Sequence, residues 1–333
     1  MEGYLETARE EALRQREEPT ELVVGHAERE ASSTALWILV IDGGGIKGLV
    51  PALIIEELEK VCGGNPVWDL FDLVCGTSTG GIIAIGTCVA RCDIKEMIDV
   101  FMNKAADIWI DHPHNVAVPF AEGKLMCNGG GKYGAAGLEN ILKRKTTKDG
   151  RPMGLDDEDV SSQFPRTCVT AVEVATRTVA EGMSHHIFSS YPRQGSPHSN
   201  KCEAWQAGRA TGAAPTFLDP IEIDTRQYVD GGLWANNPTE AAIREAERVF
   251  PGRKIGCIVS LGCGKPDQRH DLARSGMTAP IAILEAAAVQ SEQTHRKIVE
   301  DCVAGVDEEQ LTSTYSLGVP EIDAATADGL LSF

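Results

Sequence analysis

The sequence predicts an α/β protein with three layers, in which helices cover both faces of a mainly parallel central sheet. Three apolar, β-rich runs carry this prediction, because each leads into a glycine-rich turn and a helical pattern follows: Leu36–Ile41, Phe71–Cys75 and Ile255–Leu261. Continuous apolar runs of this length are typical of strands buried on both faces. Strands that alternate with helices need crossover connections, and these favour parallel pairing.

The first half of the chain follows this pattern twice. The first strand leads into the glycine-rich segment 42–48 and then a helix over 49–61, whose apolar residues fall on one side. The second strand leads into segment 76–81 and an apolar helix that continues to Ala90. A further helix is predicted over 94–109, and residues 109–126 show no regular period because prolines and charged residues interrupt it.

The second half adds strands that neighbour each other directly. The predicted elements are a helix over 137–145, a polar loop over 149–165, strands over 167–176 and 178–188, a helix over 204–212, a short strand at 228–229, the strand 255–261 and a long helix over 279–303. Asn237 and Pro238 predict the start of another helix, with the asparagine as cap and the proline in the first turn.

Composition limits the class of protein. The chain has 333 residues, of which 42% are hydrophobic and 24% charged, as in globular proteins. The formal charge of −18 argues against nucleic acid as a partner and against simple adsorption to anionic lipid. The sequence shows neither a run of apolar residues long enough to span a membrane nor a secretory signal, so we expect a cytoplasmic protein. The ten cysteines lack C-x-x-C pairs and lie mostly in apolar surroundings, which favours buried free thiols.

We expect three parts in the chain. Residues 1–33 form an acidic N-terminal extension, residues 34–325 a single folded domain, and residues 326–333 a C-terminal tail. We expect this segment to be a solvated extension, or a docking segment in a longer natural chain that carries further domains.

The first glycine-rich segment allows two interpretations. Gly43, Gly45 and Gly48 match G-x-G-x-x-G between a strand and a helix, as a dinucleotide-binding fingerprint does. That fingerprint also needs an acidic residue at the end of the next strand, where this chain has Gly76-Thr-Ser-Thr-Gly80 instead. Backbone N–H groups at such a turn bind any anion, including a transient one. An oxyanion hole is therefore the preferred interpretation.

The second glycine-rich segment predicts a nucleophile. Gly76-x-Ser78-x-Gly80 is a G-x-S-x-G motif between a strand and a helix, which is the context of a nucleophile elbow. Glycines on either side let the backbone turn tightly around the serine. The alternative is an ordinary glycine-rich turn with a capping serine.

A serine nucleophile needs a base. In a Ser-Asp-His order the histidine candidates are His270 and His295, but both lie in polar, surface-like contexts, while His112 and His114 lie in the irregular segment. Asp230 is better placed, because it follows a strand-like piece and precedes two glycines and a helix. The sequence thus favours a Ser78–Asp230 dyad, in which burial must raise the aspartate pKa toward that of a useful base.

Three motifs coincide in order and spacing: Asp-Gly-Gly-Gly-Ile-Lys-Gly at 42–48, Gly-Thr-Ser-Thr-Gly-Gly at 76–81 and Asp-Gly-Gly-Leu-Trp-Ala-Asn-Asn-Pro at 230–238. Together they resemble the patatin-like phospholipases, which include calcium-independent phospholipases A2. The segment Ala210-Thr-Gly-Ala-Ala-Pro-Thr-Phe217 is similar to the stretch before that family's catalytic aspartate. The resemblance covers approximately Trp37 to Gly264, so residues 34–325 are expected to be a patatin-like domain.

The resemblance implies roles for individual residues. Ser78 is the nucleophile, Asp230 the base, and the N–H groups of Gly43, Gly44 and Gly45 form the oxyanion hole. Lys47 stands where the family often has arginine and would orient a lipid phosphate, although it lacks the bidentate fork of a guanidinium group. The remaining motif glycines are Gly48, Gly76, Gly80, Gly231 and Gly232.

The resemblance also implies an activity: a lipid acyl hydrolase of the phospholipase A type that cleaves carboxylic esters through an acyl-serine intermediate. It implies no metal and no cofactor, a membrane lipid or lipid aggregate as substrate, and only peripheral contact with the membrane. Three alternatives stay open, namely a Ser-His-Asp esterase that uses His270 or His295, a non-catalytic signalling, scaffold or storage module with this fold, and a nucleotide-binding protein.

Overall fold

A mixed seven-stranded sheet forms the centre of the computed structural model, which describes residues 35–104, 133–162, 165–174, 183–193, 201–215, 217–264 and 291–298. The strands are β1 (Leu36–Ile41), β2 (Leu73–Gly76), β5 (Arg166–Val174), β6 (Met183–Ser189), β7 (Ile221–Ile223), β8 (Arg226–Asp230) and β9 (Ile255–Leu261). Their order is β7-β8-β5-β2-β1-β9, and β6 pairs with β5 in addition. A separate two-stranded hairpin joins β3 (Thr147–Lys148) and β4 (Arg151–Pro152).

Most strands of the large sheet run in the same direction. β1 pairs in parallel with β2 and β9, and β2 pairs in parallel with β5. β6 and β8 are antiparallel to β5, and β7 is antiparallel to β8. Only β6 and β8 therefore run against the others, which confirms the predicted mainly parallel sheet and adds an antiparallel end to it.

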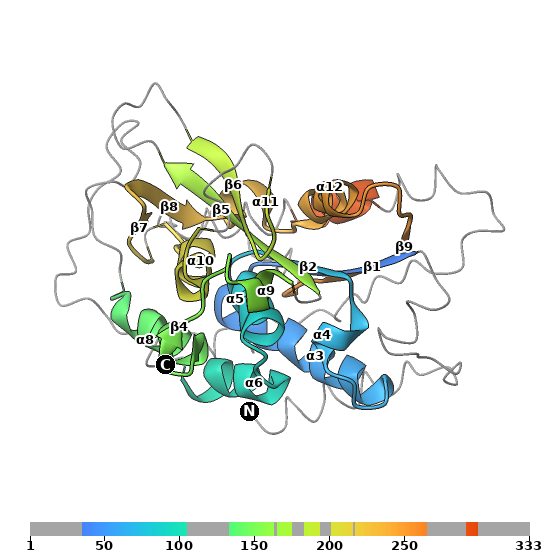
Figure 1. The fold of residues 1–333 in the computed structure, drawn as a ribbon, viewed down its shortest axis with the longest axis horizontal. Coiled ribbons are helices and arrows are strands. Elements are labelled where there is room, and N and C mark those ends of the chain that lie inside the picture. The colour runs from blue at the N-terminus through green and yellow to red at the C-terminus, as the bar shows by residue number, and fades with distance from the viewer. Residues whose placement is uncertain are drawn as a thin grey trace, which may run out of the picture.

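Helices cover both faces of this sheet (Figure 1). On one side lie α3 (Leu49–Val61), α4 (Val67–Leu70), α5 (Thr79–Ala84), α6 (Ile94–Asn103) and α10 (Ala204–Thr211). α12 (Thr239–Val249) lies on the other side. The short α11 (Gly232–Ala235) packs against β5, and α8 (Ala136–Lys145) packs against α10. Two further short elements are α9 (Glu158–Ser161) and the 3₁₀ turn η1 (Gly45–Gly48).

The side chains of β1 show how the layers form. Leu36, Ile38 and Val40 pack into the core beneath α12. Leu39 and Ile41 pack into the larger core on the opposite face. Because alternate residues of a strand point to opposite faces, a strand that is apolar at every position needs a layer on both sides. This confirms the predicted three-layer arrangement.

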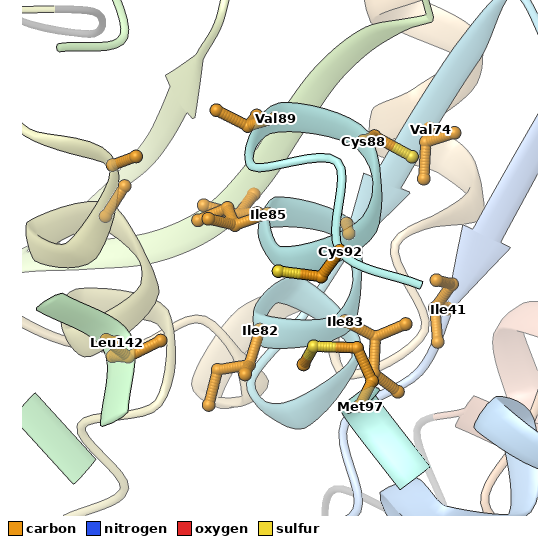
Figure 2. Packing of buried hydrophobic residues seen from close by; sticks show 14 of the residues in the cluster. Ile41, Val74, Ile82, Ile83, Ile85, Cys88, Val89, Cys92, Met97 and Leu142 are labelled. Atoms are coloured by element: carbon orange, nitrogen blue, oxygen red, sulfur yellow. The ribbon is translucent and has the colours of Figure 1, made fainter. Parts of the chain in front are cut away.

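The helix after β2 is the most buried helix of the fold's larger core. Every residue of α5 is buried, and so is every residue of the π-helical turn η2 (Ile85–Val89) that continues it. Figure 2 shows Cys88 close to Val74 and Ile83 close to Ile41 of the sheet, with Leu142 of α8 on the opposite side of the segment. The segment therefore anchors the turn that precedes it in the centre of the domain.

Several predicted boundaries agree closely with the structure, and a few differ. α3 and β9 have the predicted bounds. The segment 149–165 was expected to be a loop but contains β4 and α9. Pro238, rather than Asn237, occupies the position before α12, but the asparagine still caps the helix start, since Asn237 Oδ1 accepts hydrogen bonds from both the N–H and the hydroxyl of Thr239, the first residue of α12.

Other expectations fall wholly or partly outside the described residues. The extension 1–33, the tail 326–333, the irregular segment 109–126, and His112, His114 and His270 all lie outside them. The predicted helix 94–109 is described as α6, which ends at Asn103, and only 291–298 of the predicted helix 279–303 are described, as a helix. Among the helices that are described, none has both the length and the apolar character of a membrane span.

Candidate active site

Ser78 lies at the sharp turn between β2 and α5. Its φ of 53° places this non-glycine residue in the left-handed region, and helix α5 begins at the next residue. The flanking glycines are required by close packing: a Cβ on Gly76 would lie 2.4 Å from the Gly80 carbonyl oxygen, and one on Gly80 only 2.2 Å from that of Ile41. The predicted elbow is therefore present, with its serine half-buried and its glycines at close backbone contacts.

The Ser78 hydroxyl donates a hydrogen bond directly to a carboxylate. Its Oγ lies 2.6 Å from Asp230 Oδ2. The Ser78 N–H donates to Thr211 Oγ1 at 2.9 Å, so the strained backbone of the turn is fixed by a buried side chain of α10. The two residues predicted as nucleophile and base thus lie together, with no imidazole between them.

The pairing on β5 explains how these two residues meet. β6 pairs along one edge of β5 over residues 168–174, so β2 and β8 share the opposite edge, at 166–169 and 171–174 respectively. β2 is parallel to β5 and β8 is antiparallel to it, so the carboxyl ends of β2 and β8 point at each other across Thr170. Ser78 follows the end of β2, and Asp230 ends β8.

Hydrogen bonds of two threonine hydroxyls stabilise the place where the ends of β2 and β8 meet. Thr77 Oγ1 donates to the Ala235 carbonyl oxygen at 2.6 Å and lies 2.6 Å from Thr170 Oγ1. Because the Thr77 hydrogen is directed to Ala235, the Thr170 hydroxyl is the donor to Thr77. A Cβ on Gly231 would lie 2.1 Å from the same Thr170 hydroxyl. The elbow, β5 and the segment after Asp230 are consequently held as one unit.

Asp230 is a buried carboxyl group with a raised pKa. Its exposed fraction is 5%, its Oδ1 accepts the Gly232 N–H at 2.7 Å, and its Oδ2 accepts the Ser78 hydroxyl. Burial raises the pKa of Asp230 to about 6, against the lowering effect of these two hydrogen bonds. A carboxylate with this pKa remains mostly ionised at neutral pH and is a stronger base than an exposed aspartate.

The glycine loop 43–45 lies against the serine. A Cβ on Gly43 would be 3.0 Å from Ser78 Cβ and 2.5 Å from Asn236 Oδ1, so only glycine fits there. The Gly43 N–H donates to the Asn236 carbonyl oxygen at 3.0 Å, and the Gly44 N–H donates to Thr79 Oγ1 at 3.2 Å. Gly45 has a φ of 58° and an open surrounding. Two of the three predicted oxyanion donors therefore have protein acceptors in this state.

The remaining predicted residues lie in the 3₁₀ turn after the glycine loop, directly after Asp230, and on the helix 291–298. Lys47 is exposed, and its N–H donates to the Gly44 carbonyl oxygen in the 3₁₀ turn. A Cβ on Gly48 would lie 2.9 Å from Thr79 Cβ, which explains the glycine between the loop and α5. Gly232 supplies the N–H that Asp230 accepts. His295 lies on the helix 291–298.

Sequence reasoning missed four polar side chains of this site. Thr211 and Thr170 contact the elbow, while Asn236 and Ser291 contact the glycine loop or each other. Thr211 and Asn236 lie within motifs already singled out, so their polar character in a buried segment was an available signal. Thr170 and Ser291 carry no such signal. Among the described residues, no cluster of three histidine, cysteine or acidic side chains has the arrangement of a metal site.

The fold and site define an α/β protein with a serine at a nucleophile elbow and a buried aspartate as its partner. Residues 39–243 match the family model described as patatin-like phospholipase. This match covers more than half of the sequence, and the chain belongs to the patatin-like phospholipase family.

Several curated proteins are similar to this chain. Phospholipase A I of Arabidopsis thaliana is 29% identical over 72% of this chain and 22% of its own length. Calcium-independent phospholipase A2-gamma of Oryctolagus cuniculus is 27% identical over 78% of this chain and 32% of its own. The cGAMP-activated phospholipase of Vibrio cholerae serotype O1 is 26% identical over 75% of this chain and 70% of its own. The chain thus spans at most a third of the first two relatives.

Proposed function

We propose that the chain is a lipid acyl hydrolase that cleaves carboxylic esters of membrane lipids through a Ser78–Asp230 dyad. The hydrogen bond of 2.6 Å from Ser78 Oγ to Asp230 Oδ2 is the observation that carries this proposal. Membership of the patatin-like phospholipase family and the names of these three relatives, each a phospholipase, support a lipid ester as substrate.

The reaction begins with attack of Ser78 Oγ on the ester carbonyl carbon while Asp230 Oδ2 takes the hydroxyl proton. Negative charge develops on the former carbonyl oxygen and is held by backbone N–H groups at the glycine loop and the start of α5. In this proposal the Gly45 N–H is a primary donor, while Gly43 and Gly44 donate after exchanging their present acceptors for the oxyanion. Each such donor contributes about 3 kcal/mol to the transition state.

Collapse of this tetrahedral intermediate breaks the bond to the lipid alcohol, which receives the proton from Asp230. The acyl group then remains on Ser78. Water attacks the acyl-serine while Asp230 takes one of its protons, and the fatty acid leaves as Ser78 regains the proton. The proton acceptor and the oxyanion donors are all protein groups, so we expect turnover to survive a chelator.

We further infer that the protein acts from the cytoplasm and contacts membranes peripherally. Lys47 supports this inference, because an exposed cation at the rim of the site can pair with a lipid phosphate at the bilayer surface. Replacing Lys47 by glutamine is expected to raise KM for anionic vesicles several-fold and leave KM for a soluble neutral ester unchanged.

The decisive experiment combines lipid-product mass spectrometry with a fluorophosphonate probe, both in the presence of a chelator. The native chain is expected to release fatty acid from phospholipid vesicles and to be labelled at Ser78. Ser78→Ala should lose both, Asp230→Asn should lose turnover by about a thousandfold or more, and Ser184→Ala, on the exposed part of β6, should match the native chain.

Each alternative predicts a different result. Loss of turnover in His295→Ala or His270→Ala with retention in Asp230→Asn would support a triad instead. Absence of both labelling and turnover in the folded native chain would support a non-catalytic module. Binding of a dinucleotide in equilibrium dialysis, lost when Gly45 is replaced, would support a nucleotide site at the glycine loop.

A further inference from the structure

Asp42 is a second buried carboxyl group near the site, and the reaction above does not use it. It follows β1 directly and precedes the glycine loop, its backbone N–H donates to the Leu261 carbonyl oxygen at 2.9 Å, and its exposed fraction is 4%. Its Oδ1 has no hydrogen-bond partner among the described residues. A buried carboxyl group with one unpartnered oxygen is expensive in free energy, so a purely apolar residue would suit the core better.

The carboxyl group of Asp42 has two polar neighbours from distant parts of the chain. Hydrogen bonding by the side chains of Ser291 and Asn237 acts to lower the pKa of Asp42 against the effect of burial, which indicates that both lie near its carboxyl group. Ser291 lies on the helix 291–298, which lies beside α12 and is drawn in orange-red (Figure 1). Lys297 of this helix also donates to Glu240 of α12. Asp42 thus connects the first glycine motif to a helix outside the residues matched by the family model.

Asn236 extends this connection to the glycine loop. Its Nδ2 donates to Ser291 Oγ at 2.8 Å and to the Gly43 carbonyl oxygen at 3.2 Å. Its own carbonyl oxygen accepts the Gly43 N–H at 3.0 Å. Asn236 therefore holds the Gly43 residue from both its N–H and its C=O, and Gly43 lies against Ser78.

The chemistry of the donors fixes the direction of the chain of hydrogen bonds. An amide nitrogen can only donate, so Ser291 Oγ is the acceptor from Asn236. The Ser291 hydroxyl hydrogen is then available to the Asp42 carboxyl group. Removing either end of this chain weakens the hold on the Asn236 side chain, which is then oriented mainly by its hydrogen bond of 3.2 Å to the Gly43 carbonyl oxygen.

On this geometry, and resting on the proposed function, we infer that Asp42 is a positioning residue: through Ser291 and Asn236 it holds the glycine loop in place over Ser78. The Gly45 N–H, which is the primary donor in the proposed reaction, acts on the oxyanion only if the loop is fixed before the reaction, because small displacements strongly reduce the effect of such a donor. Burial raises the pKa of Asp42 to about 8, so the carboxyl group is mostly neutral at neutral pH and is tolerated in the core.

The test replaces the hydroxyl that connects the two side chains. Ser291→Ala is expected to lower kcat, expressed per active site titrated with a fluorophosphonate, by about tenfold with KM unchanged. Titration of active sites removes any contribution from misfolded protein. Ser291→Thr restores the hydroxyl and should restore kcat, and Gln293→Ala, an exposed position of the same helix, should match the native chain.

A double-mutant cycle tests the connection to Asp42. Asp42→Ala should lower kcat per titrated site by a similar factor, and the double variant with Ser291→Ala should be no slower than the slower single variant, because both changes break the same chain. Independent, multiplying losses would overturn the inference. So would a native kcat in Ser291→Ala, or a Ser291→Thr variant as slow as Ser291→Ala.

Hydrogen exchange separates this inference from the proposed function. The amides of residues 43–47 should exchange faster in Ser291→Ala and Asp42→Ala than in the native chain, whether or not the chain hydrolyses lipid. Faster exchange in a chain without turnover would sustain the positioning role and refute the hydrolase. Turnover that persists with unchanged exchange in both variants would refute the positioning role and sustain the hydrolase.

Discussion

At the scale of single residues, the reactivity of Ser78 depends on how its neighbours hold it. The carboxylate that would take its proton is buried, and the backbone of the serine has a positive φ that is maintained by one side chain of α10. Neither the raised pKa of Asp230 nor the backbone strain at Ser78 is a property of these two residues alone. Both follow from the elements that surround them, and both lead to measurable predictions.

The pKa of Asp230 predicts the pH dependence of the reaction. The base must be ionised, and burial raises its pKa to about 6, so kcat/KM should fall tenfold per pH unit below about pH 6 and level off above it. The measurement is the pH–rate profile on a soluble ester, which avoids changes in the lipid surface. An ascending limb centred near pH 4, as for an exposed aspartate, would contradict this environment for the base.

Removing the Thr211 hydroxyl is expected to lower kcat through its effect on the Ser78 backbone. Thr211→Val keeps the shape of the side chain and removes the acceptor of the Ser78 N–H, so the strained turn relaxes and kcat should fall by about tenfold to a hundredfold. Thr211→Ser keeps the hydroxyl and should stay within a few-fold of the native chain. Equal rates for the valine and serine variants, normalised to titrated active sites, would show that this hydrogen bond does not position the nucleophile.

At the scale of elements, the site depends on backbones that approach more closely than side chains allow. α5 starts against the carboxyl end of β1, and the Gly80 backbone lies where a Cβ would meet the Ile41 and Asp42 carbonyl oxygens. Such a contact involves two backbones, so no side-chain rotation relieves it. The glycines of the elbow are therefore required by packing as much as by the turn itself.

Replacing a glycine by alanine should destabilise the fold only where the added Cβ meets other atoms. Gly80→Ala is expected to destabilise the fold by more than 4 kcal/mol or to prevent folding, because the Cβ would lie 2.2 Å from a carbonyl oxygen. Gly134→Ala is the matched control, since a Cβ there meets nothing within 4 Å. Thermal unfolding of both variants checks the prediction, and a Gly80→Ala variant as stable as Gly134→Ala would contradict it.

The sequence allows most elements to be predicted because their signals are local. The apolar runs at 36–41 and 255–261 and the one-sided pattern of 49–61 depend only on neighbouring residues, and the structure confirms them. The π-helical turn η2 has no such signal, because the run 82–90 is apolar except for Thr87 and cannot show where an extra residue is inserted. The short α9 is not predicted for a similar reason, since three polar residues and one valine are too few to show a period.

At the scale of the whole molecule, the site exists because β2 and β8 end at the same point of β5. The sequence indicates a serine after one strand and an aspartate after another, and the structure supplies the edge that they share. That juxtaposition depends on pairings between residues that are far apart in the chain, and so does the contact of Ser291 with Asn236. Spacing alone contains no information about either pairing, whereas the combination of three motifs identifies the family.

The two buried carboxyl groups predict how the stability of the whole domain varies with pH. The pKa is raised to about 8 for Asp42 and to about 6 for Asp230, against an ordinary value of 3.8 for an aspartate side chain. In both cases the folded state binds the proton more tightly than the unfolded state does. The stabilising contribution is therefore complete below about pH 4 and is lost as the pH rises through about 6 for Asp230 and about 8 for Asp42.

Asp42→Asn isolates this effect from the repulsion among the other charges of a chain with a net charge of −18. An amide does not titrate, so the variant avoids the cost of keeping a proton at neutral pH, and it should become more stable than the native chain by several kcal/mol as the pH rises from about 5 to about 8. Urea unfolding of both proteins at these two pH values gives the difference directly. If the native chain and the variant lose the same free energy of unfolding over this interval, the Asp42 carboxyl group is ionised in the folded protein.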